Sequence, residues 1–172
     1  MTLPFGEQFI LGLTLASALG TGLMGGVFFV FSTSIMRALA RLPAAQGIAA
    51  MQSINIAVIN PFFLAALFGT AAICAALVAW SFKMWDRLDA GYLLAGSLLY
   101  LGGAILVTIF FNVPLNDALA RLDPAVGDNA VFWNSYLSTW TAWNHLRTVA
   151  CLSAAALLTV ARCQLAREGL TR

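Results

Sequence analysis

Four long apolar runs constrain the fold of this chain more than any other feature. They cover about residues 9–35, 61–82, 91–113 and 140–160, and each reaches the roughly 20 residues that a helix needs to cross a bilayer. Of the 172 residues, 61% are hydrophobic and only 9% are charged, whereas about a quarter of the residues in a soluble domain are charged. The sequence therefore predicts an all-α integral membrane protein, with one four-helix bundle formed by residues 1–172.

The segments that connect these runs suit such a bundle. The stretch from Ala44 to Ile59 is predicted to be a short amphipathic segment between the first two spans. Asn60-Pro61 then starts the second span, because proline is tolerated in the first turn of a helix. Near the end of the third run, Pro114 removes a backbone donor, and we expect the span to end there with nearby amides replacing the lost hydrogen bonds.

Small residues indicate how the spans pack. Gly22 and Gly26 form a small-xxx-small motif in the first span, and Gly96, Gly102 and Gly103 lie in the third. Such residues allow membrane helices to approach closely, so we expect the first span to lie in the bundle centre. The same small-residue faces would also permit a homo-oligomer.

Charge predicts the orientation in the membrane. Four spans place both termini on one side, which carries Lys83, Arg87, Arg162, Arg167 and Arg172. The opposite side carries Arg37, Arg41, Arg121 and Arg147, together with Asp117, Asp123 and Asp128. We expect a multi-pass protein of the cell (inner) membrane with both termini in the cytoplasm. The net charge of +2 and the lack of a dense basic tract exclude nucleic acid as a partner.

The stretch from Trp133 to Arg147 concentrates unusual side chains on one helical face. If it forms a helix, residues spaced by three, four or seven share a face. That face would carry Trp133, Tyr136, Trp140, Trp143, Asn144 and Arg147. Asn134 and the single histidine, His145, would project away from it. An arginine held by aromatic rings and an amide at the end of a membrane helix is either an anchor or a functional site.

Polar residues at membrane depth gather at the end of the bundle opposite the termini. They are Gln52, Asn55, Asn60, Asn112, Asn116, Asp117, Asn144, His145 and Arg147. Polar groups inside a membrane are expensive and mark either a site or a structural network. Because these residues come from three segments, the sequence predicts a small pocket between the helices.

Two motifs in this region resemble those of the anthrone oxygenase-like domain family. They are Asn112-Val-Pro-Leu-Asn116 at the end of the third span and Trp140-x-x-Trp143-Asn144-x-x-Arg147 at the start of the fourth. The resemblance covers about residues 12–160 and includes length, number of spans and motif order. It implies a four-span fold and site residues Asn112, Asn116, Trp140, Asn144 and Arg147. It also implies oxidation of anthrones to anthraquinones by molecular oxygen without a metal or flavin.

This chemistry assigns roles to individual residues. Arg147 and Asn144 would bind an oxyanion, and Trp140 and Trp143 would stack on a flat ring system. The general base would be His145 or Asp117, although His145 is turned away from Arg147 and Asp117 could instead pair with Arg147. The further ligand contacts that we predict are Asn55, Tyr136, Asn112 and Asn116. The expected partners are a small hydrophobic aromatic molecule or quinone and membrane lipid.

Each of these roles has an alternative. Arg147 could be a structural arginine that Asn112, Asn116 or Asp117 satisfies, and the aromatic residues could form an interfacial belt. Asn55 and Asn60 could cap the backbone where the second span begins. With one histidine in the chain, a His/Cys metal cluster is hard to assemble, but His145 could be the axial ligand of a haem. The protein as a whole could be a non-catalytic binding or accessory subunit that holds a lipid, a quinone or a partner helix.

Overall fold

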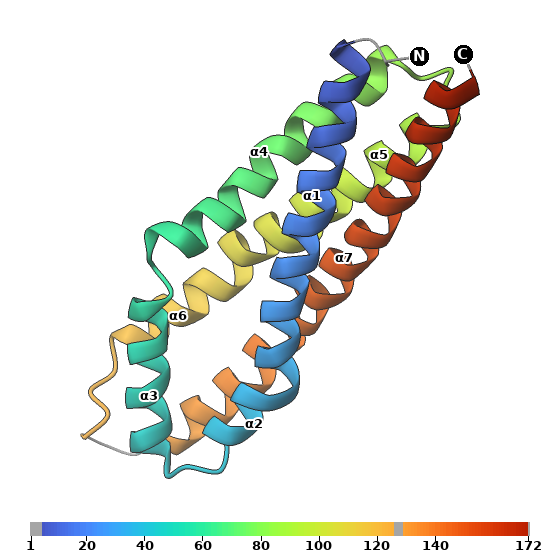
Figure 1. Ribbon diagram of the computed structural model, residues 1–172. Helices are drawn as coiled ribbons and strands as arrows, with labels where there is room; N and C mark the ends of the chain where they lie inside the picture. Colours follow the sequence, from blue (N-terminus) through green and yellow to red (C-terminus); the bar gives the residue numbers. More distant parts are fainter. Residues whose placement is uncertain (1–4, 126–128, 172) are drawn as a thin grey trace.

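The computed structural model describes residues 5–125 and 129–171 and is helical in all the regular structure of these ranges (Figure 1). Within them, four helical runs are long and apolar enough to cross a membrane: Phe5–Leu39, Pro61–Lys83, Asp89–Ala120 and Ala130–Arg167. The prediction of an all-α membrane bundle with four spans is confirmed.

The first run contains α1 (Phe5–Val30), the π-helical segment η1 (Phe31–Ile35) and α2 (Met36–Leu39). The predicted amphipathic segment between the first two spans forms the helix α3 (Ala44–Ala57).

The second span is α4 (Pro61–Lys83), and Asn60 is its N-cap. The Oδ1 of Asn60 accepts a hydrogen bond of 3.0 Å from the amide of Phe63. The capping role of Asn60 is therefore confirmed. Asn55 lies inside α3 and does not cap α4.

The helix of the third run does not end at Pro114 but continues to Ala120, and the end of the membrane span near Pro114 stays a prediction. It comprises α5 (Leu88–Tyr100), the π-helical segments η2 (Leu101–Leu106) and η3 (Thr108–Asn112), and α6 (Val113–Ala120). Directly before the proline, the amide of Val113 bonds to the carbonyl of Thr108, one residue further back than in an α-helix. Pro114 follows this widened turn, and the helix continues through it to Ala120.

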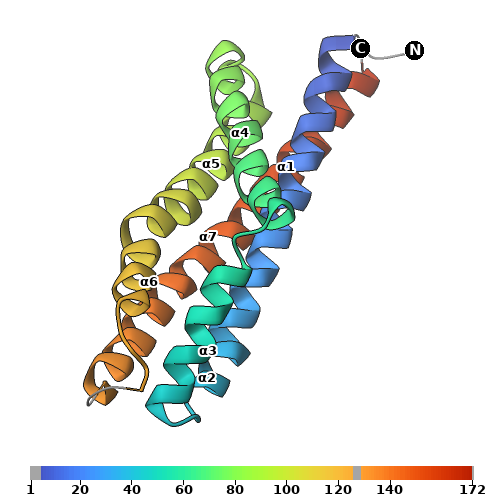
Figure 2. The same cartoon turned by 90° about the vertical axis from the view of Figure 1, so that its left-hand side faces the viewer.

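The fourth run, α7 (Ala130–Thr171), is the longest helix and extends beyond the predicted span at both ends. Its 42 residues correspond to about 63 Å at 1.5 Å per residue. Both α1 and α5 pack along α7, and α4 closes the bundle by packing on α1 and α5 (Figures 1 and 2). Both termini lie at one end of the bundle, as predicted, and α2, α3 and α6 lie at the other (Figure 1).

Among the small residues of α1, Gly25 makes the closest approach to α7. A side chain at Gly25 would collide with Leu152 of α7, whereas Gly26 is exposed with open space around it. Gly25 belongs to the buried stripe of α1, and Gly26 is rotated from it by about 100°. Of the Gly22–Gly26 motif, Gly22 faces Ala155 of α7 at van der Waals distance, and Gly26 does not contribute to the contact. In the third run, Gly96 and Gly103 approach α7 closely, while Gly102 has free space.

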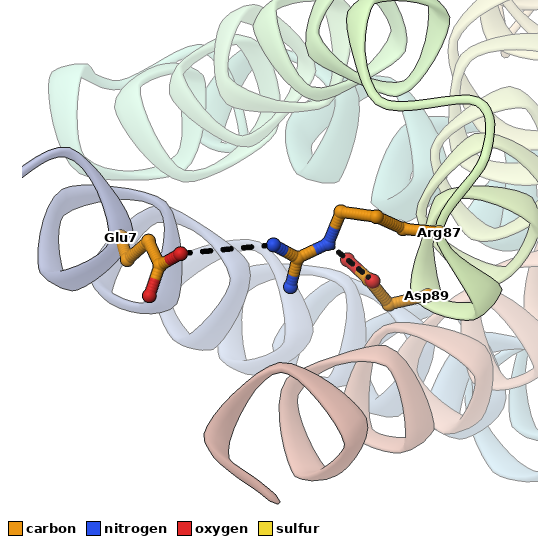
Figure 3. A network of polar contacts seen from close by, with 3 residues as sticks. All are labelled: Glu7, Arg87 and Asp89. Atoms are coloured by element: carbon orange, nitrogen blue, oxygen red, sulfur yellow. Dashed lines mark hydrogen bonds and ion pairs between the residues drawn. The ribbon is translucent and has the colours of Figure 1, made fainter. Parts of the chain in front are cut away.

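An ion-pair network holds the end of the bundle that carries the termini (Figure 3). The Nε of Arg87 lies 2.9 Å from Oδ1 of the buried Asp89, and its Nη1 lies 3.7 Å from Oε1 of Glu7. Arg87 precedes α5, and Glu7 belongs to the first turn of α1. The network therefore ties the start of α1 to the link between α4 and α5.

We expect Arg87→Gln to destabilise the bundle, because it leaves the buried carboxylate of Asp89 without its cation. The expected loss is roughly 1–3 kcal/mol, which a lower melting temperature in detergent would report. Lys83→Gln is the matched control, since Lys83 is exposed in the last turn of α4 and should leave the melting temperature unchanged. Equal melting temperatures for the two variants would contradict a stabilising role for the network.

Candidate functional site

A cavity of about 540 Å³ lies where α3 meets α4 and is lined by residues of α1, α3, α4, η3, α6 and α7. It separates two groups of core residues, one around Phe28 and Leu67 and the other around Met51 and Trp140. Most of its wall is apolar. Its polar side chains are Gln52, Asn55, Thr108, Asn112, Asn116, Asp117 and Arg147.

Arg147 is the central residue of this site. It is only 5% exposed and faces the cavity from α7. Its Nη2 donates a 2.6 Å hydrogen bond to Oδ1 of Asn144, and its Nη1 donates one of 3.2 Å to the hydroxyl of Thr108. No carboxylate in the described part of the chain pairs with it, and its Nε has no hydrogen-bond partner there. The guanidinium at the wall of the cavity is therefore not neutralised by a carboxylate of the described chain.

The guanidinium of Arg147 lies over the rings of Phe28 and Trp140. The Cζ atom of Arg147 lies 4.3 Å from the ring centre of Phe28 and 5.1 Å from that of Trp140. At these distances the negative ring faces attract the cation, an effect that is larger in a desolvated site. The rings offset part of the cost of the buried charge without neutralising it.

Asn144 fixes the position of Arg147. It is fully buried, and its Nδ2 donates 2.7 Å hydrogen bonds to the carbonyl of Phe28 and to the hydroxyl of Ser32. Its Oδ1 is thereby turned toward Arg147. Asn144 does not line the cavity, so it acts by positioning the guanidinium. The carbonyl and hydroxyl that it binds lie at the end of α1 and in η1, and π-helical segments of this kind are frequent at functional sites.

A polar stripe on the third run lines the cavity next to Arg147 and Trp140. Thr108, Asn112 and Asn116 recur every four residues and all line the cavity. Asn112 is 1% exposed, and its Nδ2 donates a 3.3 Å hydrogen bond to the carbonyl of Trp140. Its Oδ1 has no partner among the described residues, so an acceptor as well as a donor is left unused at this site.

Asn116 positions the aromatic residues of α7. Its Oδ1 accepts hydrogen bonds of 2.8 Å from both the hydroxyl of Tyr136 and the indole of Trp140. Trp140 is buried and lines the cavity, whereas Tyr136 lies behind it. The alternative of an interfacial belt is therefore wrong for Trp133 and Trp140, because both are buried inside the bundle.

Other predicted site residues lie at the rim of the cavity or outside it. Asn55 lines the cavity from α3, and Asp117 is an exposed lining residue on α6. Trp143 does not line the cavity but stacks on Phe111, with ring centres 3.7 Å apart. His145 is exposed and faces a separate surface groove that Ser32, Arg37 and Ser138 also line.

The structure corrects the predicted partners of Arg147. The sequence offers Asn112, Asn116 or Asp117 as the residues that satisfy it, but its hydrogen bonds go to Asn144 and Thr108. The pairing of Asp117 with Arg147 is wrong for the same reason. Asn144 was already predicted on the same helical face.

The sequence analysis missed three residues of the site. Thr108 was missed although its spacing of four residues from Asn112 offered a signal. Ser32 and Phe28 were missed because neither residue type suggests a contact with an asparagine 112 or 116 positions later in the chain. Gln52, which belonged to the predicted polar cluster, donates to the carbonyls of Leu119 and Leu122 at the end of α6.

These features define a small four-span membrane protein whose internal cavity is lined by a buried arginine. The chain belongs to the anthrone oxygenase family, whose sequence pattern matches residues 61–157, more than half of its length. The matched segment contains the polar stripe of the third run and the face of α7 that carries Trp140, Asn144 and Arg147. No curated protein and no solved structure is detectably similar to the chain.

We expect Asn116→Leu to disorder the aromatic wall of the cavity. The leucine leaves the hydroxyl of Tyr136 and the indole of Trp140 without their acceptor, which should cost roughly 1–3 kcal/mol. A lower melting temperature and a changed tryptophan fluorescence spectrum would report this loss. Asn134→Leu is the control, because Asn134 is exposed on the outer face of α7. An unchanged spectrum for Asn116→Leu would show that Trp140 is held by other contacts.

Proposed function

We propose that this protein oxidises a flat aromatic molecule with molecular oxygen and without a bound cofactor, as its family suggests. The observation that carries the proposal is the buried guanidinium of Arg147, which faces the cavity without a carboxylate partner in the described chain. Such a charge in a site of low dielectric favours a ligand that is negative or becomes negative during the reaction.

An anthrone fits this requirement chemically. Removal of a proton from its methylene group gives an enolate, whose oxygen carries the negative charge that Arg147 would stabilise. The electron-rich enolate reduces molecular oxygen. One oxygen atom becomes the new carbonyl oxygen at the former methylene carbon, and the other leaves as water. The anthrone and one molecule of oxygen thus yield an anthraquinone and water, with no other oxidant.

The walls of the cavity suit a flat hydrophobic ligand. Its volume of about 540 Å³ lies within the usual range of roughly 300–1,000 Å³ for small-molecule sites. Phe28, Phe31, Phe63 and Trp140 supply aromatic surface, and aromatic pairs favour offset or edge-to-face contacts with a ring system. A quinone-type product would occupy the same space.

Asp117 is our candidate for the general base. Among the cavity-lining residues it is the one carboxylate, and it lies on α6 next to Asn116. His145 faces another groove and is the weaker candidate. A substrate that reaches from Arg147 to the rim would place its acidic carbon toward Asp117.

For the membrane topology, we propose that both termini face the cytoplasm across the cell membrane. The support is the excess of basic residues at the end that carries the termini, together with the aspartates of the opposite loops.

Arg147→Met should abolish oxygen uptake while leaving the fold intact. The methionine fills a similar volume and removes a buried, unpaired charge, which should offset the loss of the bonds to Asn144 and Thr108. The measurements are oxygen consumption and quinone absorbance with a panel of anthrones, and the melting temperature in the same detergent.

Arg41→Met serves as the matched control, because Arg41 is exposed near the loop after α2. Turnover that survives in Arg147→Met would refute the assignment of the oxyanion site. A large drop of its melting temperature would instead favour an arginine that is needed for folding.

Asp117→Asn should lower kcat by about 10²–10⁴-fold if this carboxylate removes the proton. Asp86→Asn is the control, since Asp86 is exposed in the link between α4 and α5 at the opposite end of the bundle. Equal turnover in both variants would remove Asp117 from the mechanism.

A second candidate function is non-catalytic binding of the same class of ligand. It is favoured by the polar side chains that line the buried part of the cavity, since these are amides, a hydroxyl and Arg147 and include no proton acceptor of suitable strength. Stoichiometric binding of a hydroxyanthraquinone without any anthrone-dependent oxygen uptake would support this function over catalysis.

A further inference from the structure

The cavity has one open side. Its exposed lining residues are Ile56 and Ile59 at the end of α3, Phe68 of α4, and Val113, Asp117 and Ala120 of α6. Ile56 is 75% exposed and Ile59 is 70% exposed, so the rim of the cavity next to the link between α3 and α4 is widely accessible. The lining residues from α1 and α7, by contrast, are buried or half-buried. The mouth therefore faces outward between α4 and α6, and α1 and α7 form the floor.

The arrangement of the helices explains this opening. α4 packs on α5 and η2, whereas the later part of the third run diverges from it (Figure 2). α3 packs on α6 beyond the end of α4 and closes the space from the loop side. The link between α3 and α4, around Ile59, thus forms one edge of the mouth, and α6 forms the opposite edge.

Exposed side chains show where the bundle leaves the hydrocarbon on this side. On α7 they are mainly polar up to His145 (Asn134, Ser135, Ser138, Thr139 and His145) and mainly apolar afterwards (Leu146, Val149, Leu152 and Val160). The first run changes in the opposite direction between Val30 and Ser34, and the third run between Val113 and Asp117.

The length of α4 is consistent with this boundary. Its 23 residues span about 35 Å, which is close to the roughly 30 Å of the hydrocarbon core. A membrane crossed by α4 therefore ends near Pro61, at the link that forms one edge of the mouth. The opposite edge, from Val113 to Asp117, lies at the apolar-to-polar change of the third run.

We infer that the cavity takes its ligand sideways from the bilayer, through a portal between α4 and α6 at the level where the bundle leaves the hydrocarbon. The portal residues are Ile56, Ile59, Phe68, Val113 and Asp117. The inference rests on the cavity being a ligand site, as proposed above, but not on its catalytic activity.

The position of the portal selects a class of ligand. Flat aromatic molecules with one polar edge collect at the membrane interface, where the ring is apolar and the edge is hydrated. Such a molecule can slide between Ile59 and Val113 without crossing water. Inside, the side chains of Arg147 and Asn112 both line the cavity, and a guanidinium and an amide can bind a carbonyl or phenolate oxygen and a hydroxyl group. The ligand class is thus a membrane-partitioned hydroxylated aromatic ketone.

The depth of the portal can be measured with spin labels in phosphatidylcholine vesicles. In a Cys163→Ser background, single cysteines would replace Ile56, Val113, Val131 or Val149, since Cys74 and Cys151 are buried. Val131 and Val149 are exposed on α7 on either side of the inferred boundary and serve as references for water and hydrocarbon. Power saturation with oxygen and with a water-soluble nickel chelate then gives the depth of each label.

We expect the labels at residues 56 and 113 to lie at depths between those of the two reference labels, within the interface. Labels at both portal positions that are as accessible to nickel as the label at 131 would overturn the inference, because the mouth would then open to water. This measurement does not depend on turnover, so a protein without oxygenase activity can still have the portal.

Narrowing the portal should slow ligand binding. We expect the double variant Ile59→Phe/Val113→Phe to lower the association rate of 1-hydroxyanthraquinone several-fold, measured by quenching of tryptophan fluorescence in the same vesicles. Val149→Phe, on the lipid-facing side of α7, is the control. An association rate equal to that of the control would exclude this route, provided that both variants keep the melting temperature of the unaltered protein.

Discussion

The hydrogen bonds of Asn144 are the interactions on which the rest of the site depends, because they orient Arg147 and bind α7 to the end of α1. A guanidinium inside a membrane bundle is costly unless its donors and its charge are accommodated. Asn144 also connects Arg147 to the first run, because its amide donates hydrogen bonds to the carbonyl of Phe28 and to the hydroxyl of Ser32. The hydrogen bond from Arg147 to the hydroxyl of Thr108 connects α7 to the third run. The register of three spans is thereby fixed at one point, in a setting where helix association depends on close packing and polar contacts rather than on burial from water.

The cavity beside this point follows from the unequal lengths of the helices. α4 ends at about the thickness of the hydrocarbon core, whereas α7 continues for several more turns on the loop side. α3 covers the remaining flank of the bundle and ties itself to the end of α6 through Gln52. Because α3 and α4 meet at a break in the chain rather than in one continuous helix, side chains do not fill the space between their ends and η3. The cavity thus lies where the shorter helix α3 ends and the spanning helix α4 begins.

The features that depend on the periodicity of one segment could be predicted from the sequence. The irregular turns and the contacts between helices could not. The four spans and the buried face of α7 were predictable because apolar length and 3.6-residue periodicity are properties of a single segment. The continuation of the helix past Pro114 could not be predicted, since nothing in the residues before it signals a π-helical turn that accommodates the proline. The choice of Gly25 over Gly26 requires the rotation of α1 against α7. Likewise, Trp143 does not line the cavity as predicted but stacks on Phe111, a residue of another helix.

An amide at position 144 has a consequence that a carboxylate would not have. An aspartate there would accept the same hydrogen bond from Arg147, but it would also neutralise the guanidinium and close it to an anionic ligand. It would lose the donor that binds Phe28 and Ser32 as well. Asparagine instead orients the guanidinium, holds α1 and leaves the positive charge in place. The aromatic faces of Phe28 and Trp140 stabilise that charge in the same way, by attraction without neutralisation. The contacts of Arg147 with Asn144, Thr108 and the two rings therefore leave its charge without a counter-charge, which the proposed binding of an oxyanion requires.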